Sequence, residues 1–235
     1  MPEHSTGHNE QSAWLLHLLR LTSPSLPIGA YAYSRGLEYA VQAGAIHDEA
    51  SAGVWIVGLL EQLAVQHDGP FFLRLYAALQ TGDESRAEYW NALLLASREG
   101  AELRLEDTQL GAALVRWVST LDAEAAPLAE RWLGRGDVCH ATAFALAALR
   151  GGVPAEAALS GFLWAQAEGQ TSAAVRLIPL GQTAGQRVLS QVARRLPDCV
   201  QRAVWVTDDA IGAFAPGLAI ASALHETQYS RLFRS

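Results

Sequence analysis

Helical periodicity, interrupted by glycine and proline, runs along this chain and constrains its fold more than any other feature. Apolar residues recur three and four positions apart in most segments, and glycine or proline ends many of them. No stretch sustains the alternation of apolar and polar residues that a half-buried strand requires. We therefore predict an all-α fold: a single domain of roughly ten helices, packed as an irregular, orthogonal bundle with short connections.

Capping residues, prolines and glycines predict where these helices begin and end. Ser34, Asp83 and Asp137 are plausible N-caps, since each is followed by a helical pattern. Pro70 and Pro154 suit the first turn of a helix, where no backbone N–H is needed. On these signals we expect helices after Ser12 and over residues 34–44, 48–66, 70–82, 83–100, 102–121, 127–133, 137–149, 154–178, 183–196, 198–206 and 216–226.

One of these helices is apolar on every side. Its middle, from Val54 to Leu60, carries no charged or strongly polar residue, which predicts a position at the centre of the core. Gly69 and Pro70 follow this helix, and we expect the chain to break there. The helix after Ser12 carries Leu15, Leu18 and Leu19 on one face.

A turn-rich stretch, residues 22–29, precedes the short helix after Ser34. Pro24, Pro27 and Gly29 do not fit a helix or a central strand. Leu26 and Ile28 are nevertheless apolar, which is unusual for an exposed loop. We therefore predict an ordered loop packed onto the body, with partners for its backbone polar groups.

Composition excludes several classes of function. The chain has 235 residues, half of them hydrophobic, and a formal net charge of −7, which argues against a nucleic-acid binder. All 17 basic residues are arginine, so a P-loop lysine or Schiff-base lysine is impossible. Residues 1–11 are polar and predict a disordered tail without a signal core. The apolar runs are too short to span a membrane, and we expect a soluble cytoplasmic protein.

Metal-binding and catalytic motifs are weak. Cys139 and Cys199 are isolated, which suggests neither a disulfide framework nor a cysteine-rich metal site. His4 and His8 have a helical ligand spacing, but two histidines do not complete a structural site. The adjacent pair Cys139 and His140 cannot chelate alone, because neighbouring residues of a helix point in different directions. We predict no catalytic residue, no cofactor and no metal site.

Glu38 has two interpretations. It flanks the apolar face formed by Leu37 and Val41, and it lies three residues from Arg35. A solvated carboxylate weakly paired with Arg35, contributing about 0.2–0.5 kcal/mol, is the reading that helix geometry favours. The alternative is a contact with a partner protein.

Gln182 and Gln186 also leave two alternatives open. Gln186 lies at the edge of the apolar stripe of its helix, and Gln182 falls on the stripe if the helix starts early. The amides would then be buried in the core, satisfying backbone groups that Pro179 frees. Otherwise they form a polar patch at a subunit or partner contact.

The C-terminal residues 226–235 combine aromatic, apolar and basic side chains. Tyr229, Leu232 and Phe233 would share one face of a helical turn, with Arg231 and Arg234 among them. Chain ends are usually polar and frayed, so such an end docks on its own body or on a partner. We expect a mobile segment that orders on binding a partner, with His225 as a cap or hinge contact at its start.

Three stretches of the chain resemble the UreF family of urease accessory proteins. The first is residues 18–46, which contain LPIGAYAYSRGLE. The second is residues 169–191, which contain AAVRLIPLGQTAGQ, and the third is the C-terminal HETQYSRLFRS. Together they bracket nearly the whole chain, and they divide it into a tail (1–11), a UreF-like domain (12–225) and a partner-docking tail (226–235).

The resemblance implies an all-α protein, usually a dimer, without catalytic activity. Such proteins bind the accessory protein UreD, also called UreH, and then the GTPase UreG, and the assembly delivers nickel to the urease apoprotein. Glu38 and Arg176 fall in family segments linked to the coupling of GTP hydrolysis with metal transfer. The C-terminal residues fall in the segment that docks UreD. No nucleic acid or membrane is implied.

Two other classes stay open on the sequence alone. One is a helical enzyme whose site is assembled from distant residues. The other is a generic helical scaffold unrelated to urease. No motif outside the three stretches discriminates among them.

Overall fold

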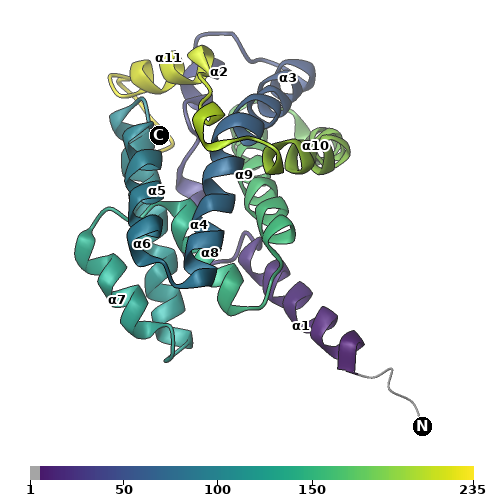
Figure 1. Ribbon diagram of the computed structural model, residues 1–235. Coiled ribbons are helices and arrows are strands. Elements are labelled where there is room, and N and C mark those ends of the chain that lie inside the picture. The colour runs from purple at the N-terminus through teal and green to yellow at the C-terminus, as the bar shows by residue number, and fades with distance from the viewer. Residues whose placement is uncertain (1–5) are drawn as a thin grey trace.

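The computed structural model describes the backbone of residues 6–235 and the side chains from residue 13 onward, and this part of the chain contains helices but no strand (Figure 1). The all-α prediction is confirmed. Two 3₁₀ turns, η1 (Ala30–Ala32) and η3 (Asp208–Ala210), and a π-helix, η2 (Leu60–Asp68), accompany the α-helices. These are α1 (Thr6–Leu21), α2 (Leu37–Gln42), α3 (Glu49–Leu59), α4 (Gly69–Thr81), α5 (Glu84–Ala96), α6 (Ala101–Leu121), α7 (Ala126–Arg135), α8 (His140–Arg150), α9 (Ala155–Leu177), α10 (Gly181–Val204) and α11 (Pro216–His225).

The alanine-rich helix α8 occupies the centre of the core. Every residue from His140 to Ala148 is buried, and α4, α6, α9 and α1 pack around it. Small residues let α6 approach the start of α8 closely. A Cβ at Gly111 of α6 would lie 2.1 Å from the carbonyl oxygen of Val138, which precedes α8. The prediction that α3 is the central helix is wrong, because its Val54 is 76 % exposed. Uniform apolarity did not distinguish a partly exposed helix from a buried one.

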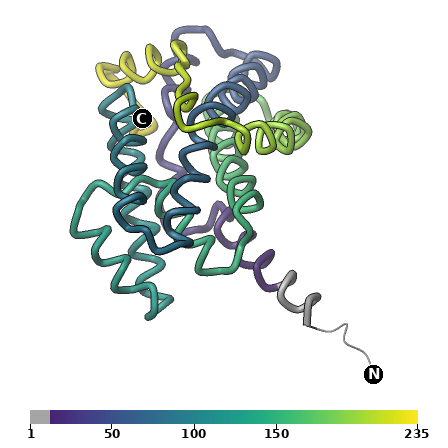
Figure 2. The backbone as a smooth tube through the Cα atoms, viewed as in Figure 1, coloured from purple at the N-terminus to yellow at the C-terminus, as the bar shows by residue number. Residues whose placement is uncertain are grey.

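The chain passes from α3 to α4 without a break, contrary to the prediction at Gly69 and Pro70. The π-helix η2 connects the two helices, and Figure 2 shows one continuous coil over this region. Pro70 has no N–H to donate to the carbonyl of Gln66. That carbonyl instead accepts a hydrogen bond from the N–H of Gly212, 2.7 Å away. A distant segment thus satisfies the group that the proline frees.

Helix α10 is a single helix that contains Pro197, so the prediction of two separate helices over 183–196 and 198–206 is wrong. Pro197 lies on the exposed face, where water can satisfy the carbonyl of Ala193. Val192 and Leu196 before the proline and Val200 after it are all buried. A continuous helix keeps these apolar residues on one face.

Helix α1 extends away from the body at the end opposite α11 (Figure 1). It begins at Thr6, ahead of the start expected near Ser12, and residues 1–5 of the predicted tail lie outside the described residues. Of the three leucines on one face of this helix, Leu18 is partly buried against α9, whereas Leu15 and Leu19 are exposed.

The turn-rich loop packs onto the body as predicted. Leu26 and Ile28 are partly buried against the core. The following helix α2 begins later than expected, at Leu37, and its N-cap is Gly36 rather than Ser34. Gly36 has φ +76°, and a Cβ there would lie 2.9 Å from the backbone nitrogen of Ser222. Both the turn and the close approach of α11 therefore favour glycine.

Within the described residues, we find no helix that is both long enough and apolar enough to cross a membrane.

Candidate functional site

The C-terminal segment, residues 226–235, is folded onto the body, and its end lies close to α11 (Figure 1) and against α6, where Ser235 contacts Glu106. Its backbone forms hydrogen bonds with the loop before α2. The N–H of Arg234 donates to the carbonyl of Ala32 at 2.8 Å, and the N–H of Ser34 donates to the carbonyl of Ser235 at 2.7 Å. The hydroxyl of Ser34 donates to the same carbonyl. The first and the third of the stretches that resemble the UreF family therefore lie in contact.

The carboxylate of Glu38 is the main receptor for this segment. Its Oε1 accepts the N–H of Leu232 at 2.6 Å, and its Oε2 accepts the N–H of Phe233 at 2.8 Å. His225 Nε2 lies 3.2 Å from the same Oε2. Only 7 % of Glu38 is exposed. A carboxylate that receives several N–H groups in a buried position holds the segment through charge-assisted hydrogen bonds.

A second carboxylate, Glu102 on α6, extends this network. His225 Nδ1 lies 2.7 Å from Oε2 of Glu102, so the fully buried imidazole bridges Glu38 and Glu102. Arg231 Nη1 donates to the other oxygen of Glu102 at 2.6 Å. We name Glu38, Glu102, His225 and Arg231 the tail network. It joins α2, α6, α11 and the C-terminal segment.

Glu106, one turn further along α6, holds the end of the segment. The hydroxyl of Ser235 donates to Oε2 of Glu106 at 2.8 Å. Burial raises the pKa of Glu106, and Arg35, whose Nε lies 3.8 Å from its Oε1, acts against that shift. Arg35 adopts φ +53°, an uncommon conformation for a residue other than glycine, which this buried arrangement holds in place.

The structure corrects the expectations for the C-terminal segment. Residues 226–235 form turns and bends rather than a helical turn, so Tyr229, Leu232 and Phe233 do not share one face. Phe233 is buried, whereas Tyr229 and Leu232 are exposed. The expected mobile tail is wrong for this structure, because its backbone is hydrogen-bonded to the body. His225 lies at the junction as predicted, but it bridges two carboxylates.

The favoured interpretation of Glu38 as a solvated carboxylate is also wrong. Arg35 does not pair with it: its Nη1 donates to Oε1 of Gln166, and its Nε faces Glu106. Glu38 is inaccessible as packed, so any effect on a partner would pass through the segment that it holds.

Arg176, Gln182 and Gln186 come together on the surface. All three are exposed and line one groove of about 210 Å³ between α9 and α10. The interpretation of the two glutamines as buried core amides is wrong, because α10 already starts at Gly181 and directs both amides outward. Arg176 makes a long hydrogen bond, 3.4 Å, to the carbonyl of Tyr31, which places the groove next to the loop before α2.

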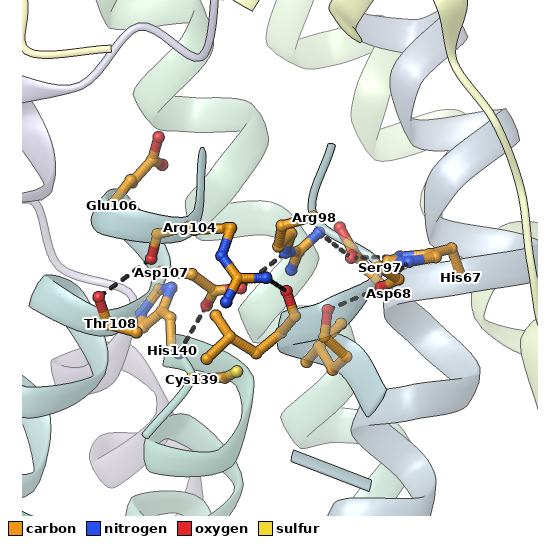
Figure 3. Close-up of polar contacts among 12 residues, drawn as sticks. His67, Asp68, Ser97, Arg98, Arg104, Glu106, Asp107, Thr108, Cys139 and His140 are labelled. Carbon is orange, nitrogen blue, oxygen red and sulfur yellow. Dashed lines mark hydrogen bonds and ion pairs between the residues drawn. The ribbon is translucent and has the colours of Figure 1, made fainter. Parts of the chain in front are cut away.

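A second charged cluster lies inside the body and is shown in Figure 3. Arg98 lies between Asp68, at 2.8 Å, and Asp107, at 2.7 Å. His67 Nδ1 lies 2.9 Å from Asp68, and Asp107 accepts the N–H of His140 at 2.7 Å. Burial opposes ionisation of Asp68, but Arg98 and His67 hold the pKa of that carboxyl well below its usual range. We name these five residues the internal cluster.

The internal cluster also explains how α8 begins. Asp137 was expected to cap this helix, but its carboxylate pairs with Arg135. Asp107 of α6 instead accepts the N–H of His140, the first residue of α8. A carboxylate at a helix N-terminus is stabilising because the first N–H groups lack intrahelical partners.

Cysteine and histidine chemistry is limited by burial. Burial raises the pKa of the Cys139 thiol far above its usual range, and burial lowers the pKa of His140 to about 4. In the part of the chain that the structure describes, no three or more histidine, cysteine, aspartate or glutamate residues form a group that could hold a metal ion. His4 and the side chain of His8 lie outside that part.

Sequence reasoning missed Glu102, Glu106 and the internal cluster. Their partners are distant in sequence: His225 is 123 residues from Glu102, and Ser235 is 129 residues from Glu106. The available signal was the number of acidic residues in α6, where Glu102, Glu106 and Asp107 interrupt an otherwise amphipathic helix. Acidic residues on the buried side of a helix indicate partners elsewhere in the fold.

Comparison with known proteins identifies the family. The sequence model of the UreF family matches residues 46–193. A urease accessory protein UreF from Alkalilimnicola ehrlichii is 46 % identical over 219 residues, covering 93 % of this chain and 94 % of the relative. UreF 2 from Brucella anthropi is 45 % identical over 221 residues, covering 94 % and 96 %. UreF from an Azoarcus species is 45 % identical over 225 residues, covering 94 % and 95 %.

These matches extend over nearly the full length of the chain and of each relative. A scaffold unrelated to urease and a helical enzyme, the two alternatives left open by the sequence, do not agree with them. The chain belongs to the UreF family of urease accessory proteins, which are not enzymes.

Proposed function

We propose that this protein is a scaffold in urease maturation that joins the accessory protein UreD (UreH) to the GTPase UreG and couples GTP hydrolysis to nickel delivery into the urease apoprotein. The observation that carries the proposal is the docked C-terminal segment. Glu38 fixes its backbone, while the side chains of Tyr229 and Leu232 stay exposed. Exposed aromatic and aliphatic side chains on a fixed backbone are typical of a protein-binding surface.

UreD is the proposed partner of this segment. Tyr229 and Leu232 would supply apolar anchors, and Arg231 and Arg234 would supply basic groups beside them. Because the segment is already ordered on the body, binding would not require the loss of conformational entropy that a disordered tail pays. The tail network would then set the shape of the binding surface, and the buried side chain of Phe233 would anchor the segment to the body.

UreG is the proposed partner of the groove that holds Arg176, Gln182 and Gln186. These side chains are exposed and donate hydrogen bonds, and the groove adjoins the loop that contacts the C-terminal segment. Glu38 would act on UreG only indirectly, by keeping that segment and loop in place. This arrangement would let the two partner surfaces influence each other through α2 and the residues before it.

A homodimer completes the proposal. Helix α1 exposes Leu15, Leu16 and Leu19, an apolar surface of the kind that marks protein contacts. The mass of the purified protein in solution, measured by light scattering after size exclusion, would decide between monomer and dimer. Substituting the three leucines by serine would show whether α1 takes part.

Co-purification tests the assignment of the C-terminal segment. The double variant Tyr229→Ser, Leu232→Ser leaves every contact of Glu38 in place, so we expect an unchanged fold and a loss of UreD from the complex. Tyr89→Ser with Leu121→Ser is the matched control, because these exposed residues lie on α5 and α6, away from the segment. Retention of UreD at wild-type stoichiometry by the first variant would place the docking surface elsewhere.

A further inference from the structure

A cavity of about 280 Å³ lies between the loop before α2 and the helices α6, α8 and α9. Its volume is close to the lower end of the range for small-molecule pockets, about 300 Å³. Glu168, Ser172 and Arg176 line both this cavity and the surface groove. Much of the cavity wall is apolar, from Leu21, Leu26, Ile28, Leu110, Phe144 and Ala173.

Two buried polar atoms of residues that line the cavity have no hydrogen-bond partner. They are Nε2 of His140 and Oε1 of Gln170, and the two residues are 9 % and 6 % exposed. The amide nitrogen of Gln170 donates to the carbonyl of Ser34 at 2.7 Å, which fixes the orientation of the amide and leaves its oxygen unpaired. An unsatisfied buried polar group costs about 1–3 kcal/mol, so both atoms favour a bound polar group.

No charge is available for a ligand beside these two atoms. Burial keeps the imidazole of His140 neutral, since it lowers the pKa to about 4. Burial also raises the pKa of Glu106, whose carboxyl faces Arg35. Arg35 is engaged by Glu106 and by Gln166. Arg176 also lines the cavity, but it borders the surface groove, where its guanidinium is exposed to water and contacts the carbonyl of Tyr31. A charged head group beside His140 and Gln170 would lose its hydration without a free countercharge next to it, so a neutral one fits better.

We propose that this cavity binds a small neutral organic molecule with an aromatic or aliphatic body and one head group that both donates and accepts hydrogen bonds, such as a primary carboxamide. The body packs against Leu26 and Phe144. The head group donates to Oε1 of Gln170 and pairs with Nε2 of His140, which accepts or donates according to its tautomer. This inference does not depend on the proposed partners.

Three probes with the same ring test the ligand class. Benzamide has the proposed head group, benzoate carries a charge in its place, and toluene has neither donor nor acceptor. In titrations of the full chain followed by amide NMR, we expect benzamide to shift the signals of cavity residues saturably. Benzoate and toluene should each bind at least about tenfold more weakly, because one buries a charge and the other leaves the polar atoms unpaired.

Two variants test the location. Ala173→Leu fills the cavity and should abolish benzamide binding, while Ser160→Leu, on the same helix but outside the cavity, should not. His140→Phe keeps the aromatic packing against Phe144 and Phe162 and removes Nε2. It should weaken the binding of benzamide at least about fivefold and leave the affinity for toluene unchanged. This measurement tests the proposal even if the Ala173→Leu variant does not fold.

The proposal is overturned by any of three results. The first is the absence of a saturable shift with benzamide up to its solubility limit, which is the result expected if the cavity holds only ordered water. The second is equal binding of the three probes, which would make the cavity a nonspecific apolar site. The third is an unchanged affinity for benzamide in the His140→Phe variant, which would remove the assigned polar contact.

Discussion

The tail network and the internal cluster are both built from carboxylates, histidine and arginine, yet they hold different parts of the molecule. In the internal cluster, Arg98 and its two aspartates are all buried and link the end of η2, the start of α6 and the start of α8. The tail network connects a non-helical segment whose Arg231 is partly exposed. Charge pairs inside the body support the whole fold, whereas those at the C-terminal segment support a surface that can detach locally.

Removing the central arginine should give the largest effect. In Arg98→Met, Asp68 and Asp107 lose their cationic partner while they stay buried, and we expect the free energy of unfolding to fall by about 3–5 kcal/mol. Urea denaturation measures this. Arg150→Met is the control, because Arg150 pairs with Asp122 and Glu124 near the surface. That change should cost at most about 1 kcal/mol, and equal losses in the two variants would contradict the comparison.

The internal cluster should also respond to pH through His140. Burial lowers its pKa to about 4, below the usual value of 6.5, so the unfolded chain binds more protons than the folded one between these values. Its contribution to stability is complete above pH 6.5 and is lost as the pH falls toward 4, a change of roughly 3 kcal/mol. His140→Phe should remove that part of the pH dependence in urea denaturation between pH 7 and 4.5. An unchanged slope would show that other groups carry it.

Releasing the C-terminal segment should lower the free energy of unfolding less than a change in the internal cluster does. Glu38→Gln keeps the side-chain shape but removes the charge that receives the N–H groups of Leu232 and Phe233. The released backbone N–H groups of the segment can then form hydrogen bonds with water, so we expect only about 1–2 kcal/mol of global destabilisation. Amide hydrogen exchange over residues 226–235 should accelerate at least about tenfold, while α8 stays protected. Unchanged exchange in the segment would show that Phe233 and the backbone contacts hold it without Glu38.

The local parts of the fold could be predicted from the sequence, and the long-range parts could not. Proline, glycine and apolar spacing predicted the ordered loop and most helices. They could not show that η2 continues through Pro70, since the group that satisfies the Gln66 carbonyl is Gly212. They also could not assign Glu38, whose partner Leu232 is 194 residues away. The sequence pattern around a buried carboxylate does not differ from that around an exposed one, so its burial cannot be predicted before its distant hydrogen-bond donors are known.

Substitutions in the groove between α9 and α10 should have the smallest effect on stability. The groove residues are exposed, whereas Glu38 is buried. Arg176, Gln182 and Gln186 are exposed, and Arg176 makes one long hydrogen bond. We therefore expect the triple alanine variant to change the free energy of unfolding by less than about 0.5 kcal/mol.

Its expected defect is in partner binding alone. If the groove receives UreG, the triple variant should keep UreD in a pull-down from co-expressing cells and lose UreG, with lower GTP-dependent urease activation. Arg187→Ala and Arg194→Ala together form the matched control, because both arginines lie on α10 and are exposed outside the groove. Glu38→Gln should instead lose UreD first, because it changes the segment proposed to bind UreD. If the triple variant retains UreG, the groove is not the GTPase surface, and the loop beside the C-terminal segment becomes the next region to examine.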